Sequence, residues 1–360
     1  MILANNDIGL YKFRKELIIS LVKNYQVYIV LPHGDFVEEL VQLGCVFCPV
    51  NLNRRGTNPI DDLKLLNEYR KLLCSIKPDV VLTYTIKPNI YGGIACMLHR
   101  IPYVTNITGL GTAVENKGIL QKITIRLYKF ALKKAQKVFF QNEENRLFMI
   151  RHGIISGAND ILPGSGVNLE LYKPLSYPNA DAVDFVFVAR VMKEKGIDQY
   201  LEAAEYIHSK YPYARFHICG FCEEDYQQVI SQMCERAIVI YHGSVKDMIP
   251  IYKMSSCTIH PTYYPEGMSN VLLESCASAR PIITTDRPGC KEIVEDGING
   301  YIVKEKDSGD LIEKIEQFLQ LTNEQRKEMG LRGREKVERE FDRNIVVNKY
   351  LAEIDNDGRL

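Results

Sequence analysis

The sequence lacks the common signatures of dinucleotide and nucleoside triphosphate binding. In TGLGTAVENKG, Gly109 and Gly111 are present, but Val114 occupies the third glycine position of the Gly-x-Gly-x-x-Gly fingerprint. PGSGVNLE also lacks the third glycine of this fingerprint, and the sequence contains no Walker A loop. An NAD-dependent enzyme is therefore not expected.

An excess of one charge sign and long apolar runs are also missing. Lys plus Arg and Asp plus Glu number 45 each, so global charge gives no reason to expect nucleic acid as a partner. No apolar run is long enough to cross a bilayer, and the N-terminus has no secretory apolar segment. The ten cysteines are then expected to be reduced thiols of a cytoplasmic protein.

Two Cys-x-x-Cys pairs, Cys45/Cys48 and Cys219/Cys222, leave a zinc site open as an alternative. Each pair overlaps a predicted strand end, and buried cysteine commonly serves as a small hydrophobic residue. We therefore interpret these cysteines as packing residues and predict no metal site.

Short β-rich runs alternate with helix-period segments throughout the chain. This alternation indicates βαβ units with parallel sheets, and 360 residues are too many for one ordinary core. We therefore predict an α/β protein with two Rossmann-like domains. The predicted strands are MILAN, QVYIVL, CVFCPV, DVVLTYT, IPYVTNI and KVFFQ in the first half, and DFVFVAR, ARFHICG, AIVIYHG, CTIHPT and PIITTD in the second.

The joint is expected in residues 163–184, which are rich in Pro, Gly, Asn and Ser and precede a new buried strand. We predict a first domain at 1–165 and a second at 166–340. Residues 341–360 are predicted as a C-terminal helix that crosses back to the first domain.

The stretch YPEGMSNVLLE places Glu266 directly after the strand pattern CTIHPT. Ligands bind outside the carboxyl ends of parallel strands, so Glu266 is expected at that rim. The glycine that follows permits close backbone approach, and the first amides of the next helix suit phosphate or sugar oxygens. The predicted ligand-binding turn comprises Glu266, Gly267, Met268, Ser269, Asn270 and Val271.

Glu274 lies about two helical turns after Gly267 and is expected on the same helix face. Two carboxylates around a helix start suit a ligand with hydroxyl groups on both sides of a phosphate. The alternative is that Glu266 caps the helix while Glu274 forms a surface ion pair, because carboxylates are common in a first helical turn.

DFVFVARVMKEKG places Arg190 at the end of a buried strand and Lys195 five residues later. A rigid guanidinium and a flexible ammonium together suit a diphosphate, whose negative charge grows as it departs. A pair of solvated cations at a loop is the alternative. It fits Lys193 and Lys195 better than it fits Arg190, which ends an apolar strand.

Arg190 and Lys195, followed by HPTYYPEGMSNVLLE and ARPIITTDRPGCKEIVEDGINGYIV, resemble the family 4 glycosyltransferases. The resemblance is dense over residues 184–305 and weaker elsewhere. It implies a retaining GT-B enzyme with two domains facing a central cleft, a nucleotide-sugar donor with UDP as the expected carrier, and no cofactor. The two cations would hold the diphosphate. Glu266 and nearby amides would contact the donor hexose, and Glu274 the ribose.

The resemblance also implies a mechanism. The departing phosphate accepts the proton of the acceptor, so Glu266 is not assigned as a nucleophile. Arg190, Lys195 and Glu266 are the predicted catalytic residues. No Asp-x-Asp follows an apolar strand, so no divalent ion is expected. His242 ends a strand pattern where the nucleotide base should lie, with a packing role as the alternative.

The first half is most similar to bacterial capsule, O-antigen and lipid-linked-glycan transferases, through ANNDIGLYKFRKELI, IKPNIYGGIA and NITGLGTAVENKG. This similarity implies a lipid-linked saccharide acceptor and a place on the inner face of the membrane. Relatives carry a histidine in a first-domain loop where this chain has Thr85 and Thr108, and a glycine where it has Ala279, which we interpret as a packing change. The predicted acceptor-side residues are Asn6, Gly9, Lys87, Thr108, Gly109 and Gly111.

Residues 116–142 contain no acidic residue. Basic residues follow helical spacing on one side and apolar residues on the other, which predicts docking of residues 117–137 on an anionic membrane surface. An ordinary amphipathic helix with a solvated basic face is the alternative. The basic residues are Lys122, Arg126, Lys129, Lys133 and Lys137, and the apolar ones Leu120, Ile123, Leu127 and Phe130.

Two other functions fit the same architecture. A UDP-sugar 2-epimerase would need acid–base carboxylates and histidines in the first domain, and the sequence does not show them there. A non-catalytic sugar-nucleotide-binding partner of a transferase would not need the complete set of two cations and two carboxylates. We therefore predict a glycosyltransferase.

Overall fold

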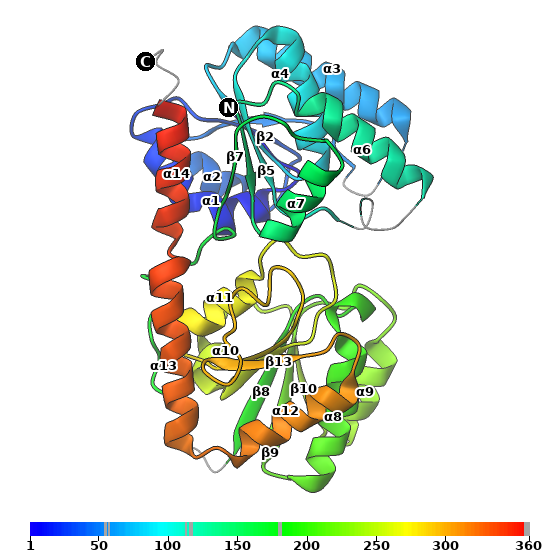
Figure 1. Ribbon diagram of the computed structural model, residues 1–360, viewed down its shortest axis with the longest axis vertical. Coiled ribbons are helices and arrows are strands. Elements are labelled where there is room, and N and C mark those ends of the chain that lie inside the picture. The colour runs from blue at the N-terminus through cyan, green and yellow to red at the C-terminus, as the bar shows by residue number, and fades with distance from the viewer. Residues whose placement is uncertain (54–55, 57, 112–113, 115–117, 179–181, 356–360) are drawn as a thin grey trace. The chain divides into compact units, whose positions relative to one another are not determined.

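The computed structural model describes residues 1–53, 56, 58–111, 114, 118–178 and 182–355. The chain divides into two compact units (Figure 1): unit 1 contains Met1–Gly166 and Arg343–Leu360, and unit 2 contains Val167–Asp342. Lys117 of the predicted basic stretch and residues 356–360 of the predicted last helix lie outside the described residues.

Unit 1 is built on a seven-stranded sheet in the order β3-β2-β1-β4-β5-β6-β7. All neighbouring strands run parallel. The strands are β1 (Ile2–Leu3), β2 (Tyr28–Leu31), β3 (Val46–Pro49), β4 (Val81–Tyr84), β5 (Tyr103–Ile107), β6 (Lys137–Phe140) and β7 (Asn159–Ile161).

Helices cover both faces of this sheet, which is why its strands are apolar on both sides. Side chains of α1, α2 and α14 form one core with the sheet, and those of α3, α4, α6 and α7 form the cores on the other face. The helices are α1 (Asp7–Val22), α2 (Val37–Gln42), α3 (Pro59–Ile76), the π-helix η1 (Pro88–Gly92), α4 (Gly93–His99), α6 (Ile119–Ala131), α7 (Glu143–Arg151) and α14 (Arg343–Asp355).

The last helix, α14, is part of unit 1 although it follows unit 2 in the chain. Tyr350 is buried, packs edge-on against Phe139, and its hydroxyl accepts a hydrogen bond of 2.7 Å from Asn106. Arg343 donates to the carbonyl of Gly166 at 3.0 Å and to Glu16 at 2.9 Å. These contacts explain the crossing of the chain back to the first unit.

Unit 2 contains a six-stranded sheet in the order β10-β9-β8-β11-β12-β13, again with parallel neighbours. The prediction of two parallel α/β units is therefore confirmed. The strands are β8 (Val183–Val188), β9 (Ala214–Cys219), β10 (Val239–Gly243), β11 (Cys257–His260), β12 (Ile282–Thr285) and β13 (Gly300–Val303).

The helices of unit 2 are also divided between the two faces of the sheet. Side chains of α8, α9 and α12 form one core with the sheet, and those of α10, α11 and α13 pack on its other face. The elements are the 3-10 turn η2 (Lys193–Lys195), α8 (Ile197–Lys210), α9 (Gln227–Glu235), α10 (Ile249–Met254), α11 (Asn270–Ala277), α12 (Ser308–Gln320) and α13 (Asn323–Glu340).

The strand order reverses once in each sheet, between β1 and β4 in unit 1 and between β8 and β11 in unit 2. At such a point the connections leave in opposite directions and open a crevice beyond the carboxyl ends of the strands. The loops after these four strands are therefore where each unit is expected to bind a ligand.

Two strands were not predicted, and two predicted helix positions were wrong. β7 and β13 are short and only partly buried, so neither produces a long apolar run. The basic helix ends at Ala131, so Lys133 lies in the turn that follows it. Lys137 begins β6 and lies 3.7 Å from Glu353 of α14. Among the described residues, no helix is both long and apolar enough to cross a membrane.

Candidate active site

The two predicted cations and the first carboxylate lie at the reversal point of unit 2. Arg190 follows β8, Lys195 ends the 3-10 turn after it, and Glu266 follows β11, the adjacent strand. The two loops are in close contact, because a Cβ atom on Gly196, whose φ is +79°, would lie 2.1 Å from the carbonyl oxygen of Pro261. Only glycine permits this approach.

Each cation is held by a carboxylate. Lys195 donates to Oε1 of Glu266, and Arg190 donates to Oε2 of Glu223 from the loop after β9. Both cations lie over the ring of Tyr264, whose centre is 4.7 Å from the Lys195 ammonium and 5.4 Å from the Arg190 guanidinium. Lys195 is 10% exposed and Arg190 31%. The site therefore holds two positive charges that carboxylates of the chain neutralise.

The ionisation of Glu266 follows from this pairing. Burial is the largest single effect and would raise the pKa of its carboxyl group, but the neighbouring polar and charged groups, Lys195 foremost, together outweigh burial and hold the pKa below its usual value. Glu266 is thus an ionised hydrogen-bond acceptor at neutral pH. An acceptor of this kind suits sugar hydroxyl groups.

The helix start after Glu266 differs in one detail from the expectation. Ser269 is the N-cap of α11, but its amide donates to the carbonyl of Gly289 at 2.8 Å. The amides of Asn270 and Val271 come next, in the first turn, where a helix supplies no carbonyl acceptor. Glu274 accepts a hydrogen bond of 3.2 Å from the buried hydroxyl of Tyr252. The assignments of Glu274 to ribose, and of Met268 and its neighbours to the donor, stay predictions.

His242 belongs to a chain of polar contacts across three strands of unit 2. Its Nε2 lies 2.9 Å from Nδ1 of His217, and Nε2 of His217 lies 2.9 Å from Asp184. Asp184 also accepts two hydrogen bonds of 2.7 Å from Arg215. Partial burial, followed by His217, lowers the pKa of His242, so the ring is neutral at pH 7. A contact between His242 and the nucleotide base stays a prediction.

The predicted acceptor-side residues follow three adjacent strands of unit 1. Asn6 follows β1 and caps α1, and its side chain accepts a hydrogen bond of 2.6 Å from the amide of Gly9. Thr108, Gly109 and Gly111 follow β5. Because β1, β4 and β5 are neighbours in the sheet, these loops share its carboxyl edge.

Lys87, after β4, is already engaged within unit 1. Its ammonium lies 2.7 Å from Asp62 of α3, and the hydroxyl of Tyr91 donates to the same carboxylate at 2.8 Å. Thr85, just before it, has a φ of +71°, a strained conformation for a β-branched residue. The loop is held in one unusual shape, and a role for Lys87 toward an acceptor stays a prediction.

The position of Ala279 corrects our interpretation of that residue. Its φ is +55°, in the left-handed region that glycine adopts without strain. The glycine of relatives at this position is thus explained by backbone conformation and not by packing. Ala279 bears the strain because it lies beside Arg280, a fully buried residue in the same turn.

Sequence reasoning missed Glu223 and His260 at this site. Glu223 lies 33 residues from Arg190 in the chain, and its only sequence signal is its place after a predicted strand. His260 ends β11, is 2% exposed, and has its Nε2 4.0 Å from Glu266. The contact of Glu223 with Arg190 joins two loops, whereas His260 and Glu266 belong to the same segment of the chain.

The first Cys-x-x-Cys pair, Cys45/Cys48, lies in unit 1, and the second, Cys219/Cys222, lies in unit 2. Burial raises the pKa of Cys45 to about 11 and that of Cys219 to about 12, as expected for cysteines that pack as small hydrophobic residues. Among the described residues, no three His, Cys, Asp or Glu side chains cluster as metal ligands.

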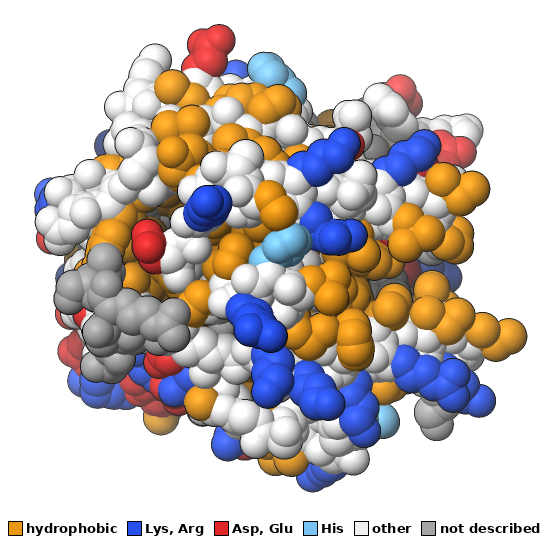
Figure 2. All heavy atoms as spheres, turned by 90° about the horizontal axis from the view of Figure 1, so that it is seen from above, with side chains coloured by type: hydrophobic (Ala, Val, Ile, Leu, Met, Phe, Trp, Pro, Cys, Tyr) orange, Lys and Arg blue, Asp and Glu red, His pale blue; other side chains and the backbone are white. Residues whose placement is uncertain are grey.

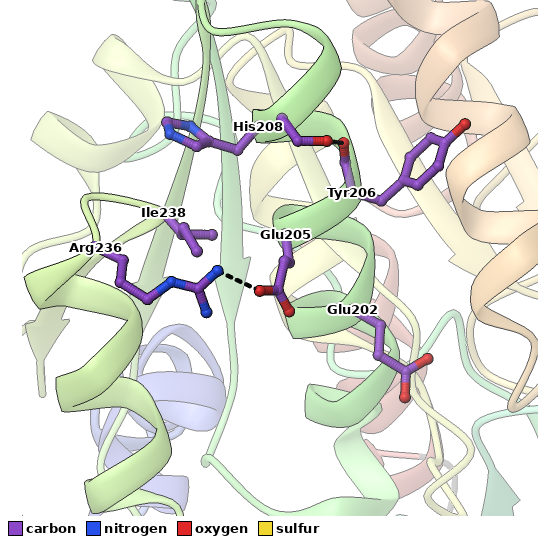
Figure 3. A pocket seen from close by; sticks show the side chains of 7 residues that line it. Glu202, Glu205, Tyr206, His208, Arg236 and Ile238 are labelled. Atoms are coloured by element: carbon purple, nitrogen blue, oxygen red, sulfur yellow. Dashed lines mark hydrogen bonds and ion pairs between the residues drawn. The ribbon is translucent and has the colours of Figure 1, made fainter.

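A shallow hollow lies elsewhere on unit 2, where α8 and the end of α9 come together (Figure 3). Arg236 is paired with Glu205 across it, and Ile238 at its floor immediately precedes β10. The hollow is therefore near the amino end of that strand. Ligands of parallel sheets bind at the carboxyl ends, so we do not assign this hollow to the donor.

Comparison with known proteins agrees with the geometry in both units. Residues 3–142 match the family described as glycosyl transferase 4-like, and residues 176–336 match glycosyl transferases group 1. The protein HepE of Anabaena, crystallised with UDP and glucose, superposes with a TM-score of 0.79 over 99% of this chain and 98% of its own, at 17% identity. This similarity supports the fold.

Two curated relatives are similar in sequence. One is the N,N'-diacetylbacillosaminyl-diphospho-undecaprenol alpha-1,3-N-acetylgalactosaminyltransferase of Campylobacter jejuni, 25% identical over 97% of this chain and 96% of that protein. The other is the UDP-Gal:alpha-D-GlcNAc-diphosphoundecaprenol alpha-1,3-galactosyltransferase of Escherichia coli, 25% identical over 79% and 76%. With both halves matched to glycosyltransferase families and both sheets arranged as in the GT-B fold, the chain belongs to the family 4-like glycosyltransferases.

Proposed function

We propose that this chain transfers a hexose or an N-acetylhexosamine from a UDP-sugar to a lipid-linked saccharide in bacterial surface-glycan assembly, with retention at the anomeric carbon. The observation that carries the proposal is the convergence of Arg190, Lys195 and Glu266 at the reversal point of the unit 2 sheet. The acceptors named for the two relatives support the acceptor class. The UDP bound to HepE supports the carrier.

In the proposed reaction, the bond between the anomeric carbon and the β-phosphate oxygen breaks, and the acceptor oxygen bonds to that carbon on the same face. Arg190 and Lys195 balance the charge that grows on the departing UDP. A phosphate oxygen of UDP takes the proton of the acceptor hydroxyl, so no protein nucleophile is required. Glu266 accepts hydrogen bonds from the hexose and orients it.

The experiment has two steps. A thermal-shift panel of nucleotide sugars identifies the donor, and mass spectrometry of a lipid-linked saccharide then detects the added sugar, with EDTA or with Mg²⁺. We expect the same rate of transfer with EDTA and with Mg²⁺, because the two cations and the first amides of α11 supply the positive charge at the diphosphate. Thermal stabilisation of the protein by a nucleotide sugar, without transfer of the sugar, would identify a non-catalytic sugar-nucleotide-binding protein. Conversion of the donor to its C2 epimer without an acceptor would identify an epimerase.

The proposal includes a membrane-facing surface on α6, which we call the α6 surface. Thr124, Tyr128 and Ala131 face the core and are buried. Of the predicted apolar side, Leu127 packs partly against the core, whereas the other three residues are exposed. Figure 2 shows apolar and basic side chains beside one another on the face seen from above. The α6 surface consists of Ile119, Leu120, Ile123 and Phe130, which are 79%, 48%, 48% and 51% exposed, with exposed Lys122, Arg126 and Lys129.

Charge and apolar groups on one helix face suit an anionic lipid surface, where each cation contributes about 1 kcal/mol. Replacing Lys122, Arg126 and Lys129 by glutamine should therefore weaken binding to phosphatidylglycerol vesicles about a hundredfold in co-sedimentation at low salt. Replacing Ile119, Ile123 and Phe130 by serine should also weaken binding.

Leu63→Ser is the matched control, because Leu63 is an apolar residue of α3 with 63% exposure outside the α6 surface. It should leave vesicle binding unchanged. The membrane role would be wrong if the natural chain failed to sediment with these vesicles, or if all the variants bound equally well.

A further inference from the structure

His260 is a buried polar side chain that the proposed mechanism does not use. It ends β11 and is 2% exposed, and within the described part of the chain neither of its ring nitrogens has a hydrogen-bond partner. Its backbone is held in place, because the hydroxyl of Thr284 donates to its carbonyl at 2.9 Å. Buried polar atoms almost always have a partner, so the ring is expected to have one in another state of the site.

The charged groups that act on the ring are Lys195 and Glu266. Nε2 of His260 lies 4.0 Å from Oε1 of Glu266, the oxygen that accepts the hydrogen bond of Lys195. Burial lowers the pKa of His260 to about 3, with Lys195 adding to the effect. The ring is therefore neutral at physiological pH and carries one N–H.

Donor binding changes the partners of Glu266. If the diphosphate takes the Lys195 ammonium, as the proposed function requires, the Glu266 carboxylate loses its closest positive charge. Glu266 is only 17% exposed, and a largely buried carboxylate that loses a charged hydrogen-bond donor is destabilised. A shift of about 1 Å would bring His260 within hydrogen-bond distance of it.

We propose that His260 is a positioning residue, whose Nε2–H donates to Glu266 when the donor diphosphate engages Lys195, and so holds that carboxylate toward the hexose. A neutral donor suits this task, because a second cation would compete with the hexose hydroxyls for the same oxygens. The inference rests on the proposed function and deepens it by assigning the support of its sugar-binding carboxylate.

The test compares His260→Met, which fills the space without a donor, with His260→Gln, whose amide nitrogen can take the place of Nε2. We expect His260→Met to bind UDP as the natural protein does, but to lose about tenfold to a hundredfold in affinity for the UDP-sugar and in kcat. His260→Gln should restore most of both.

The pH profile separates positioning from a general loss of structure. A hydrogen bond to a carboxylate lowers the pKa of that group, so its removal raises the pKa of Glu266 in the donor complex. The acid limb of kcat should move to higher pH in His260→Met and return in His260→Gln.

The inference would be overturned if His260→Met matched the natural protein in its affinity for the UDP-sugar, in kcat and in the acid limb of the pH profile of kcat. If His260→Met melts too low for assay, His260→Gln is compared with His260→Asn, whose shorter amide replaces Nδ1 instead. Equal activity of these two would then overturn it. Failure of the natural protein to bind any nucleotide sugar would instead refute the proposed function.

Discussion

Replacement of Lys195 by alanine is expected to lower kcat for sugar transfer by about two to three orders of magnitude. The ammonium is largely buried beside Tyr264 and Glu266, so no water-exposed cation can easily replace it. Its loss removes positive charge at the departing diphosphate and leaves Glu266 without its main counter-charge. Arginine at this position should restore only part of the rate, because a planar guanidinium does not fit the space of an ammonium.

The matched control is Lys193→Ala. Lys193 is two residues away and exposed, and it should change kcat by less than about twofold. Glu223→Gln is a control of opposite sign: it releases Arg190 from its carboxylate, so UDP should bind more tightly. Transfer by Lys195→Ala within threefold of the natural rate would contradict the assignment.

Replacement of Arg280 by methionine is expected to lower the free energy of unfolding of unit 2 by about 3–5 kcal/mol. Arg280 is fully buried, and burial lowers its pKa to about 10, so it still carries its charge at neutral pH. Its guanidinium donates to the carbonyls of Leu175, Ser176, Tyr252, Lys253, Ser278 and Ala279. Methionine would fill the volume but leave these acceptors without a donor.

Chemical denaturation followed by circular dichroism measures this loss. Arg332→Met is the matched control, since Arg332 is half-exposed on α13 and forms only surface pairs with Glu328 and Glu335, worth less than about 1 kcal/mol. If both substitutions lowered the free energy of unfolding equally, the buried carbonyl contacts of Arg280 would contribute no more to stability than the surface pairs of Arg332.

The strand ends of unit 2 show how far the sequence alone could lead. DFVFVAR is a nearly continuous apolar run because β8 is covered on both faces, whereas apolar and polar residues alternate in CTIHPT. The residues after them had to lie at the carboxyl edge, so Arg190, Lys195 and Glu266 could be singled out from their positions. β7 and β13 were missed because partial burial leaves no such run.

The α6 segment shows where pattern reasoning fails. Its basic and apolar residues were predictable as two sides of one helix, but periodicity cannot tell which side meets the core. The structure buries Thr124, Tyr128 and Ala131 and leaves Ile119 and Phe130 exposed. That choice depends on the shape of the sheet against which the helix packs.

The order of apolar runs and the residues at their ends determined the fold class, the two units and the positions of Arg190 and Lys195 after a strand, because hydrophobic periodicity and strand order can be inferred from the sequence itself. Only the tertiary structure decided the partners of those residues: Glu223 for Arg190, and Glu266 for Lys195. Lys195 and Glu266 are 71 residues apart, and they meet because β8 and β11 are neighbours in the folded sheet.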